Sequence, residues 1–250
     1  MSGSRQSKTA HRCEVRKIPT SSLVHFTQFK AGIYKAAQEA LIANDPDYVQ
    51  EWSRDPVGRA SRKPAKGLPQ KWKGMLEALV SYEFTLEQVK LALKFLGTQC
   101  PFQEPICSQG QWVQYHFHAW LDFAYSWKEK HELLVKRASR VLGKHHDGQL
   151  QRLLSELPNL WGKLDVTRAK YVHETGAVPG ISEDVGWEVC VLLRMDAASF
   201  LQDHESLVPF QQRWHAMLVQ VTAKQLATLE KFFEHLNKIL FLDSRTSAPS

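Results

Sequence analysis

The run QGQWVQYHFHAWLDFAYSWKEKHELLVKRASRVL, residues 109–142, decides the fold of this 250-residue chain. Its apolar residues recur with helical spacing, and they include Trp112, Tyr115, Trp120, Phe123, Trp127, Leu134 and Ala138. At about 1.5 Å per residue, one helix over this run is roughly 50 Å long. A helix of that length can serve as the spine of a bundle. We therefore expect an all-α protein with this run as its long central helix.

Further helices are expected on both sides of this run, for a bundle of roughly seven to eight helices. Ser21 or Ser22 can cap a first helix from about residue 23 to 42, which Asp45-Pro46 then ends. The remaining predicted helices cover about 70–81, 85–97 with a capping box at Thr85, 149–156 ended by Pro158, 182–201 and 209–242. Few stretches alternate with period two, so strands should be scarce.

Composition divides the chain into four segments. Residues 1–21 are rich in Ser, Lys and Arg without a hydrophobic period, and we expect a flexible basic tail there. Residues 22–108 form an N-terminal helical extension with a basic loop over 52–70, where three prolines forbid a continuous helix. Residues 109–243 form the main helical bundle, and residues 244–250 form a polar tail.

Positive charge is concentrated in the first third of the chain. The net charge is +6, but residues 1–73 contain fourteen Lys or Arg against six Asp or Glu, and residues 74–250 contain eighteen against twenty. Such a segment can face nucleic acid or an acidic protein. The loop residues that would bind nucleic acid are Arg54, Arg59, Arg62, Lys63 and Lys66. A solvated basic tail and loop is the alternative.

The cysteine content and the hydropathy indicate a cytoplasmic protein. Four cysteines, at positions 13, 100, 107 and 190, match no metal or redox spacing, and we expect them to be reduced. A Cys100–Cys107 disulfide is the alternative in an oxidising compartment. No segment reaches the ~18 consecutive apolar residues of a membrane span. The N-terminus lacks the apolar region of a secretory signal, so no membrane association is expected.

The strongest chemical signal lies at residues 165–174, DVTRAKYVHE, at the expected end of a helix. The Arg168 guanidinium can grip a phosphate and stabilise the charge that develops on it. The His173 imidazole can accept a proton from a ribose 2′-hydroxyl or return one to the leaving oxygen, without a metal or cofactor. On an ideal helix the two positions are about 140° apart. They converge only where the helix breaks or where a second subunit completes the site.

An Arg-x4-His element in an all-helical bundle, continued as YVHE and a proline, resembles the HEPN domain superfamily. The resemblance implies a HEPN-like bundle over 109–243, a homodimer with a shared cleft, and a metal-independent endoribonuclease or RNA-binding effector. It implies that Arg168 binds phosphate and that His173 is the catalytic base or acid, supported by Asp165, Tyr171 and Glu174. Family members act in toxin–antitoxin and phage-defence systems, so the implied partners are RNA and a cognate antitoxin or other partner protein.

A non-catalytic protein is the alternative. Arg168 can form an ordinary ion pair with Asp165 or Glu174. Ala169 stands where the family often has a polar residue, which favours a member that binds without cleaving. The alternative function is a helical interaction or scaffold protein that binds a partner protein or nucleic acid through its basic first third and its aromatic faces.

Weaker candidates come from the long helix and the loop after it. A second Arg-x4-His match pairs Arg140 with His145. His116 and His118 are two residues apart, so they point to different faces of a helix and should not share a metal. The run His145-His146-Asp147 could hold a metal, but a solvated helix end is the expected role. Trp112, Tyr115, Trp120 and Trp127 could stack on bases, but packing along the spine is their expected role.

Overall fold

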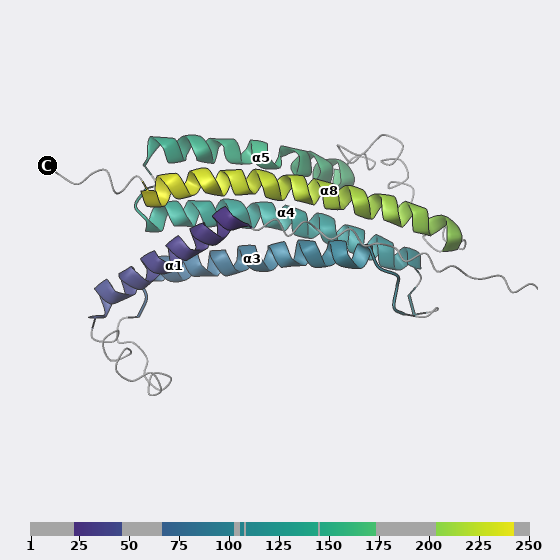
Figure 1. Ribbon diagram of the computed structural model, residues 1–250, viewed down its shortest axis with the longest axis horizontal. Coiled ribbons are helices and arrows are strands. Elements are labelled where there is room, and N and C mark those ends of the chain that lie inside the picture. Colours follow the sequence, from purple (N-terminus) through teal and green to yellow (C-terminus); the bar gives the residue numbers. More distant parts are fainter. Residues whose placement is uncertain are drawn as a thin grey trace, which may run out of the picture.

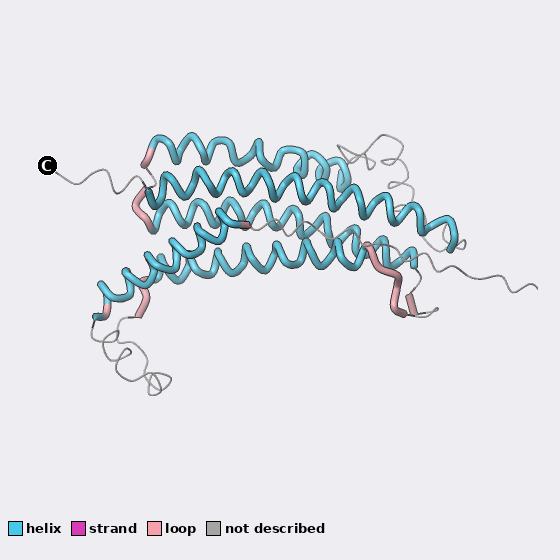
Figure 2. Tube along the Cα trace, viewed as in Figure 1, coloured by secondary structure: helices cyan, strands magenta, loops and turns pink. Residues whose placement is uncertain are grey.

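The computed structural model describes residues 23–46, 67–102, 106–107, 109–144, 146–173 and 204–242, with the backbone alone for 162–173, 204–210 and 242. Of the described residues 88% are helical and none lies in a strand, which confirms the all-α prediction (Figure 2). The described helices are α1 (Val24–Asn44), α3 (Gln70–Leu96), α4 (Gln109–Val141), α5 (Gly148–His173) and α8 (His204–Asn237), which a short π-helix, η2 (Lys238–Leu242), continues. These five helices are fewer than the seven or eight expected, and the expected helix at 182–201 lies outside the described residues.

Four helices run side by side along the long axis of the molecule (Figure 1). α4 contacts α3, α5 and α8, and α5 and α3 each contact α8 as well. Short connections make α3 antiparallel to α4 and α4 antiparallel to α5, whereas α8 runs in the direction of α4. The fifth helix, α1, lies obliquely at one end and packs on α8. The α3–α4 connection and the beginning of α8 therefore lie at the opposite end of the bundle.

The long central helix is confirmed almost to the residue. α4 spans Gln109–Val141, against the predicted 109–142, and it ends where Gly143 adopts a left-handed conformation with φ of 69°. The Lys144 amide donates to the Ser139 carbonyl at 2.9 Å, so the turn satisfies a carbonyl that the helix end would otherwise leave open. The next helix starts at once, because the Asp147 carboxylate accepts from the amides of Gln149 and Leu150.

The two helices predicted at 70–81 and 85–97 are one helix, so that prediction was wrong. Thr85 is buried in the middle of α3, and its hydroxyl donates to the Ser81 carbonyl at 2.8 Å instead of capping a new helix. Buried residues recur at three- and four-residue spacing from one end of α3 to the other: Trp72, Met75, Leu79, Tyr82, Leu86, Val89, Leu93 and Leu96. Burial of this uninterrupted apolar face keeps α3 continuous, although the sequence at Thr85 is typical of a helix start.

Pro158 lies inside α5, so the prediction that it ends a helix was also wrong. Its side chain is exposed, and water can therefore reach the backbone carbonyl that proline leaves without a partner. Leu150, Leu157 and Trp161 are buried on both sides of it at helical spacing. Burial of this stripe against α4 and α8 outweighs the loss of one backbone hydrogen bond.

The start of α1 is held by a residue far along the chain, whereas Ser21 and Ser22, the predicted caps, lie outside the described residues. The Glu230 carboxylate, on α8, accepts from the amides of His25 at 2.9 Å and Phe26 at 3.1 Å. A carboxylate at this position satisfies two open amides and faces the positive end of the helix dipole. Phe29 of α1 packs against Phe233, with 5.2 Å between ring centroids. Helix α1 is thus held in place by its contacts with α8.

One hydrophobic core runs through all five helices. It includes three fully buried tryptophans, Trp127, Trp161 and Trp214, and it takes residues from the expected N-terminal extension as well as from 109–243. Trp120 and Trp127 are buried in it, which supports spine packing for both. Close packing extends to glycine: a Cβ at Gly32 of α1 would lie 2.7 Å from the ring of Phe241.

Candidate functional site

The predicted Arg168/His173 pair lies in the last part of α5. The helix continues without a break through Arg168 to His173, the last described residue of this segment. The two positions are therefore about 140° apart around one helix and about 7.5 Å apart along it. The side chains of Asp165, Arg168, Tyr171 and His173 lie outside the described residues, as does all of Glu174. Since no helix break separates the pair, a shared cleft would need a second copy of the chain.

The other nucleic-acid candidates also fall outside the described part. Arg54, Arg59, Arg62, Lys63 and Lys66 belong to the segment 47–66, of which nothing is described. Arg140 is exposed in the last turn of α4, and its proposed partner His145 is not described. The prediction that these basic residues bind nucleic acid stays a prediction.

An aromatic cluster occupies the end of the bundle where α3 turns into α4. We call this the turn cluster: Phe95, Phe102, Ile106, Trp112, Tyr115 and His116. The Trp112 ring lies 5.7 Å from Phe95, 6.2 Å from Phe102 and 4.2 Å from His116 between centroids, and Tyr115 lies 5.0 Å from His116. The Trp112 indole also donates to the Phe95 carbonyl at 2.9 Å, which covers one open carbonyl near the end of α3.

The outer members of the turn cluster are far more exposed than large apolar residues usually are. Phe102 is 53% exposed, Tyr115 68% and Ile106 76%. Ring contacts that run through the half-buried Trp112 and the buried His116 join Phe102 to Tyr115. This end of the bundle therefore presents several exposed apolar side chains, which is the kind of surface that protein interfaces use.

His116 lies beneath this surface as a neutral imidazole. It is buried, its Nε2 atom has no hydrogen-bond partner, and burial lowers its pKa. Burial also lowers the pKa of His118, which the nearby Asp122 partly offsets. A neutral histidine without a carboxylate to orient it is a weak candidate for a general base. We therefore assign His116 a role in packing and not in proton transfer.

A buried network of two glutamines closes the same end of the bundle. The Gln109 amide donates to the Gln211 side-chain oxygen at 2.8 Å, and the Gln211 amide donates to the carbonyls of Leu96 at 2.6 Å and Thr98 at 2.8 Å. The Cys100 amide donates to the Gln109 side-chain oxygen at 2.6 Å. The network thus ties the end of α3 to the starts of α4 and α8, and it satisfies the carbonyls that α3 leaves open.

His131 was missed by the sequence analysis, although its pKa is the most strongly lowered among the described histidines. It is completely buried on α4, and burial lowers its pKa to about 3. Its Nδ1 atom accepts from the Trp161 indole of α5 at 3.1 Å, and its ring lies 5.9 Å from that of Tyr82 and 5.0 Å from that of Phe232. The signal was present, because residue 131 continues the apolar spacing of 127, 134 and 138.

The environment of His131 indicates a structural role. The side chains within ring contact are aromatic: Tyr82, Trp161, Phe232 and Phe233. A polar ring in such a place specifies one arrangement of α4 and α5, because only one tautomer accepts the indole proton. It stays neutral at physiological pH, since the surrounding hydrocarbon disfavours the imidazolium.

The described loop cysteines and Asp147 of the suggested metal ligands can also be compared with their predicted roles. Cys100 and Cys107 are free thiols, as expected of reduced cysteines, and the Cys100 thiol lies 3.6 Å from the Cys107 carbonyl. Burial, followed by the hydrogen bond with Cys100, raises the pKa of Cys107. Asp147 caps α5, which is the helix-end role expected for the 145–147 run. Across the described residues no three His, Cys, Asp or Glu side chains gather as a metal site would need.

Comparison with known proteins gives no relative for this chain. It matches no family model, no curated protein and no solved structure. Within the part of the chain that is described, no helix combines the length and the apolar character that a membrane crossing requires. The function must therefore be argued from the surfaces and side chains themselves.

Proposed function

We propose that this protein is a helical interaction protein without catalytic activity, and that it binds a partner protein through the turn cluster. The observation that carries the proposal is the exposure of Phe102, Ile106 and Tyr115 at one end of an otherwise well-packed bundle. Aromatic residues held by a rigid scaffold lose little conformational freedom on binding, which favours them as interface anchors. Among the described residues the most perturbed histidine, His131, is enclosed by aromatic rings and cannot reach a substrate.

The turn cluster has an inner part that is held by hydrogen bonds and an outer part whose side chains are exposed. Trp112 is anchored by its hydrogen bond to Phe95, and the glutamine network beneath holds the three helix ends together. Phe102, Ile106 and Tyr115 can therefore be changed without touching the core. A partner that covers them would remove apolar surface from water at about 25 cal/mol per Å² before the costs of association.

The test is affinity capture with a triple variant, Phe102→Ser/Ile106→Ser/Tyr115→Ser. We expect the wild-type protein to retain a stoichiometric partner that the triple variant loses, because the hydrophobic contact area is gone. Leu133→Ser is the matched control, since Leu133 is an exposed apolar residue of α4 outside the cluster. Equal capture by the wild type and the triple variant, with the fold intact by circular dichroism, would refute the proposal.

The ribonuclease hypothesis is a second proposal, and it is supported by the phosphate-binding and proton-transferring residue types of Arg168 and His173 in the last described turns of α5. In it, His173 activates the ribose 2′-hydroxyl for attack on the adjacent phosphorus, and Arg168 stabilises the charge on the phosphoryl oxygens. The products would be a 2′,3′-cyclic phosphate and a 5′-hydroxyl. Incubation with total RNA and EDTA tests it: cleavage should disappear in Arg168→Ala and in His173→Ala. Equal cleavage by the wild type and His173→Ala would remove this residue from the mechanism.

A further inference from the structure

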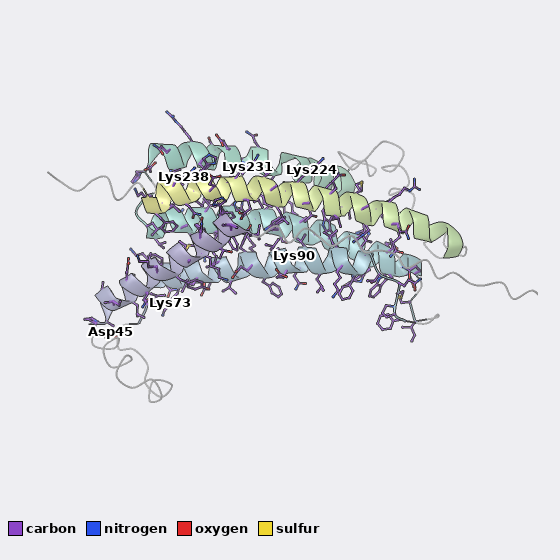
Figure 3. The ribbon with its side chains drawn as sticks, in the orientation of Figure 1. Asp45, Lys73, Lys90, Lys224, Lys231 and Lys238 are labelled. Atoms are coloured by element: carbon purple, nitrogen blue, oxygen red, sulfur yellow. The ribbon has the colours of Figure 1, made fainter. Side chains whose placement is uncertain are left out.

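The exposed residues of α3 follow a regular pattern. After Lys71, every exposed position of the helix falls in one line with alternating spacings of four and three residues: Lys73, Glu77, Val80, Phe84, Glu87, Leu91 and Lys94. We call this line the outer stripe. Its middle carries large apolar side chains, with Val80 58% exposed, Phe84 64% and Leu91 41%. Figure 3 shows side chains projecting from α3 on the side away from α4 and α8.

This spacing is that of a helix seam that packs against another helix. An average of 3.5 residues keeps one line of side chains facing a partner helix. The opposite face of α3 already uses its own apolar residues in the core, whereas Val80, Phe84 and Leu91 of the outer stripe stay exposed among the described residues. Glu77, also in the stripe, lies 3.9 Å from Arg137 of α4 in an exposed ion pair. Helix α1 touches α3 beside the stripe, through the Lys30–Glu83 ion pair at 2.5 Å, and leaves Phe84 exposed. An unused seam therefore runs along the described surface of α3.

The charges of the outer stripe complement those of an antiparallel copy of the same stripe. When two copies meet about a two-fold axis between positions 85 and 86, Glu77 lies opposite Lys94 of the second copy, and Val80 lies opposite its Leu91. Phe84 lies opposite Glu87, whose carboxylate is paired with Lys90 at 2.7 Å and whose methylenes can cover the ring. A parallel arrangement would place Glu77 against Glu77 and Lys94 against Lys94, which is repulsive.

The alternative antiparallel registers fit less well. A shift by one heptad towards the start of α3 opposes Glu77 with Glu87 of the second copy. In the preferred register Lys73 extends to the C-terminal end of the other α3, where the helix dipole favours a positive charge. The charges therefore favour the preferred register over this shift.

We propose that the outer stripe of α3 is the interface of an antiparallel homodimer. The occupant of the seam is a second copy of this chain, and the turn cluster stays free for another partner. The proposal does not rest on the proposed function, because it uses a different surface. A single helix pair lies at the small end of protein interfaces, so the dimer should be weak and dependent on concentration.

Zero-length carbodiimide cross-linking with mass spectrometry gives the sharpest test. Positions 77 and 94 are about 25 Å apart on one straight helix at 1.5 Å per residue, so a bond between their side chains can only join two chains. We expect a Glu77–Lys94 cross-linked peptide in the dimer band. Cross-links that join these residues instead to another segment of the same chain would overturn the proposal, because the seam would then be covered from within.

Sedimentation velocity with three sets of variants completes the test. Phe84→Ser should make the protein monomeric, and Tyr115→Ser, which removes an equally exposed aromatic of α4, should not. Glu77→Lys and Lys94→Glu should each weaken the dimer about tenfold, and the double variant should restore it. Lys71→Glu is the control for charge, because it lies off the stripe. A monomer at every concentration, or a dimer unaffected by Phe84→Ser, would refute the interface.

Discussion

The middle of the bundle and its end near the α3–α4 turn accommodate a buried polar side chain between helices in two different ways. Both hold α4 and α8 to a third helix around a buried polar side chain. In the middle, His131 has one hydrogen bond, from Trp161, and is otherwise enclosed by aromatic rings. At the end, Gln109 and Gln211 form hydrogen bonds with each other and with backbone groups of residues 96, 98 and 100. The comparison shows that buried apolar surface is the main source of stability around His131, whereas satisfied hydrogen bonds are the main source at the end of the bundle.

Replacement of Trp161 by alanine should have the largest effect on stability. Trp161 is fully buried and bonds His131, so the variant leaves a cavity between α4 and α5 and an imidazole without its donor. We expect the free energy of unfolding to fall by about 3–5 kcal/mol. Urea denaturation monitored by circular dichroism measures this. Trp112→Ala is the matched control, and an equal loss in both variants would show that the middle is not special.

Acid should destabilise the fold, with the largest single contribution from His131. The folded-state pKa of His131 is about 3, below the value of roughly 6.5 in an unfolded chain. Its contribution to stability is therefore complete above pH 6.5 and is lost as the pH falls towards 3. Between pH 7.5 and pH 4 this histidine alone should remove about 3 kcal/mol. Burial lowers the pKa values of His116 and His215 as well, so they act in the same direction.

The variant His131→Gln separates this contribution from the others. Glutamine can still accept from the Trp161 indole, but it does not titrate. The stability of the variant, from urea midpoints at pH 7.5 and pH 4, should fall less with acid than that of the wild type. Parallel pH profiles for the two proteins would show that His131 is not the group responsible.

Replacement of Gln211 by leucine should have a smaller effect, confined to the end of the bundle. The leucine leaves the carbonyls of Leu96 and Thr98 and the Gln109 amide with poorer partners, at a cost of about 1–3 kcal/mol. Amide hydrogen exchange should rise near residues 96–100 and stay low around residue 131. Gln220→Leu, at an exposed position of α8, is the control. Faster exchange along the whole bundle would contradict the division into two regions.

The sequence predicted those parts of the fold that depend on long, regular patterns. The bounds of α4 and α1 followed from apolar spacing and from Gly143 and Asp45-Pro46 as end signals. Two local signals led to wrong predictions of helix ends, because Thr85 and Pro158 lie in helices whose apolar stripes continue across them. At both positions, tertiary burial on one face outweighed the local signal.

The candidate sites were harder to predict, because each is assembled from distant segments. The surroundings of His131 come from α3, α4, α5 and α8, so only its place in the apolar spacing was visible beforehand. The turn cluster needed the α3–α4 connection to bring Phe102 against Trp112. The Arg168/His173 pair was assigned to a helix end, and the described part of α5 reaches His173 without a break. Its chemistry stays a prediction, because it depends on side chains outside the described residues.

The cap on α1 has a consequence for the order in which the chain can fold. Glu230, which bonds the amides of α1, is 205 positions further along the sequence than His25, and Phe233 and Phe241 are later still. During synthesis α1 leaves the ribosome before the residues of α8 that hold it. Native docking of α1 must therefore wait until α8 has been made, and a chain truncated before residue 230 should expose the aromatic face of α1 to aggregation.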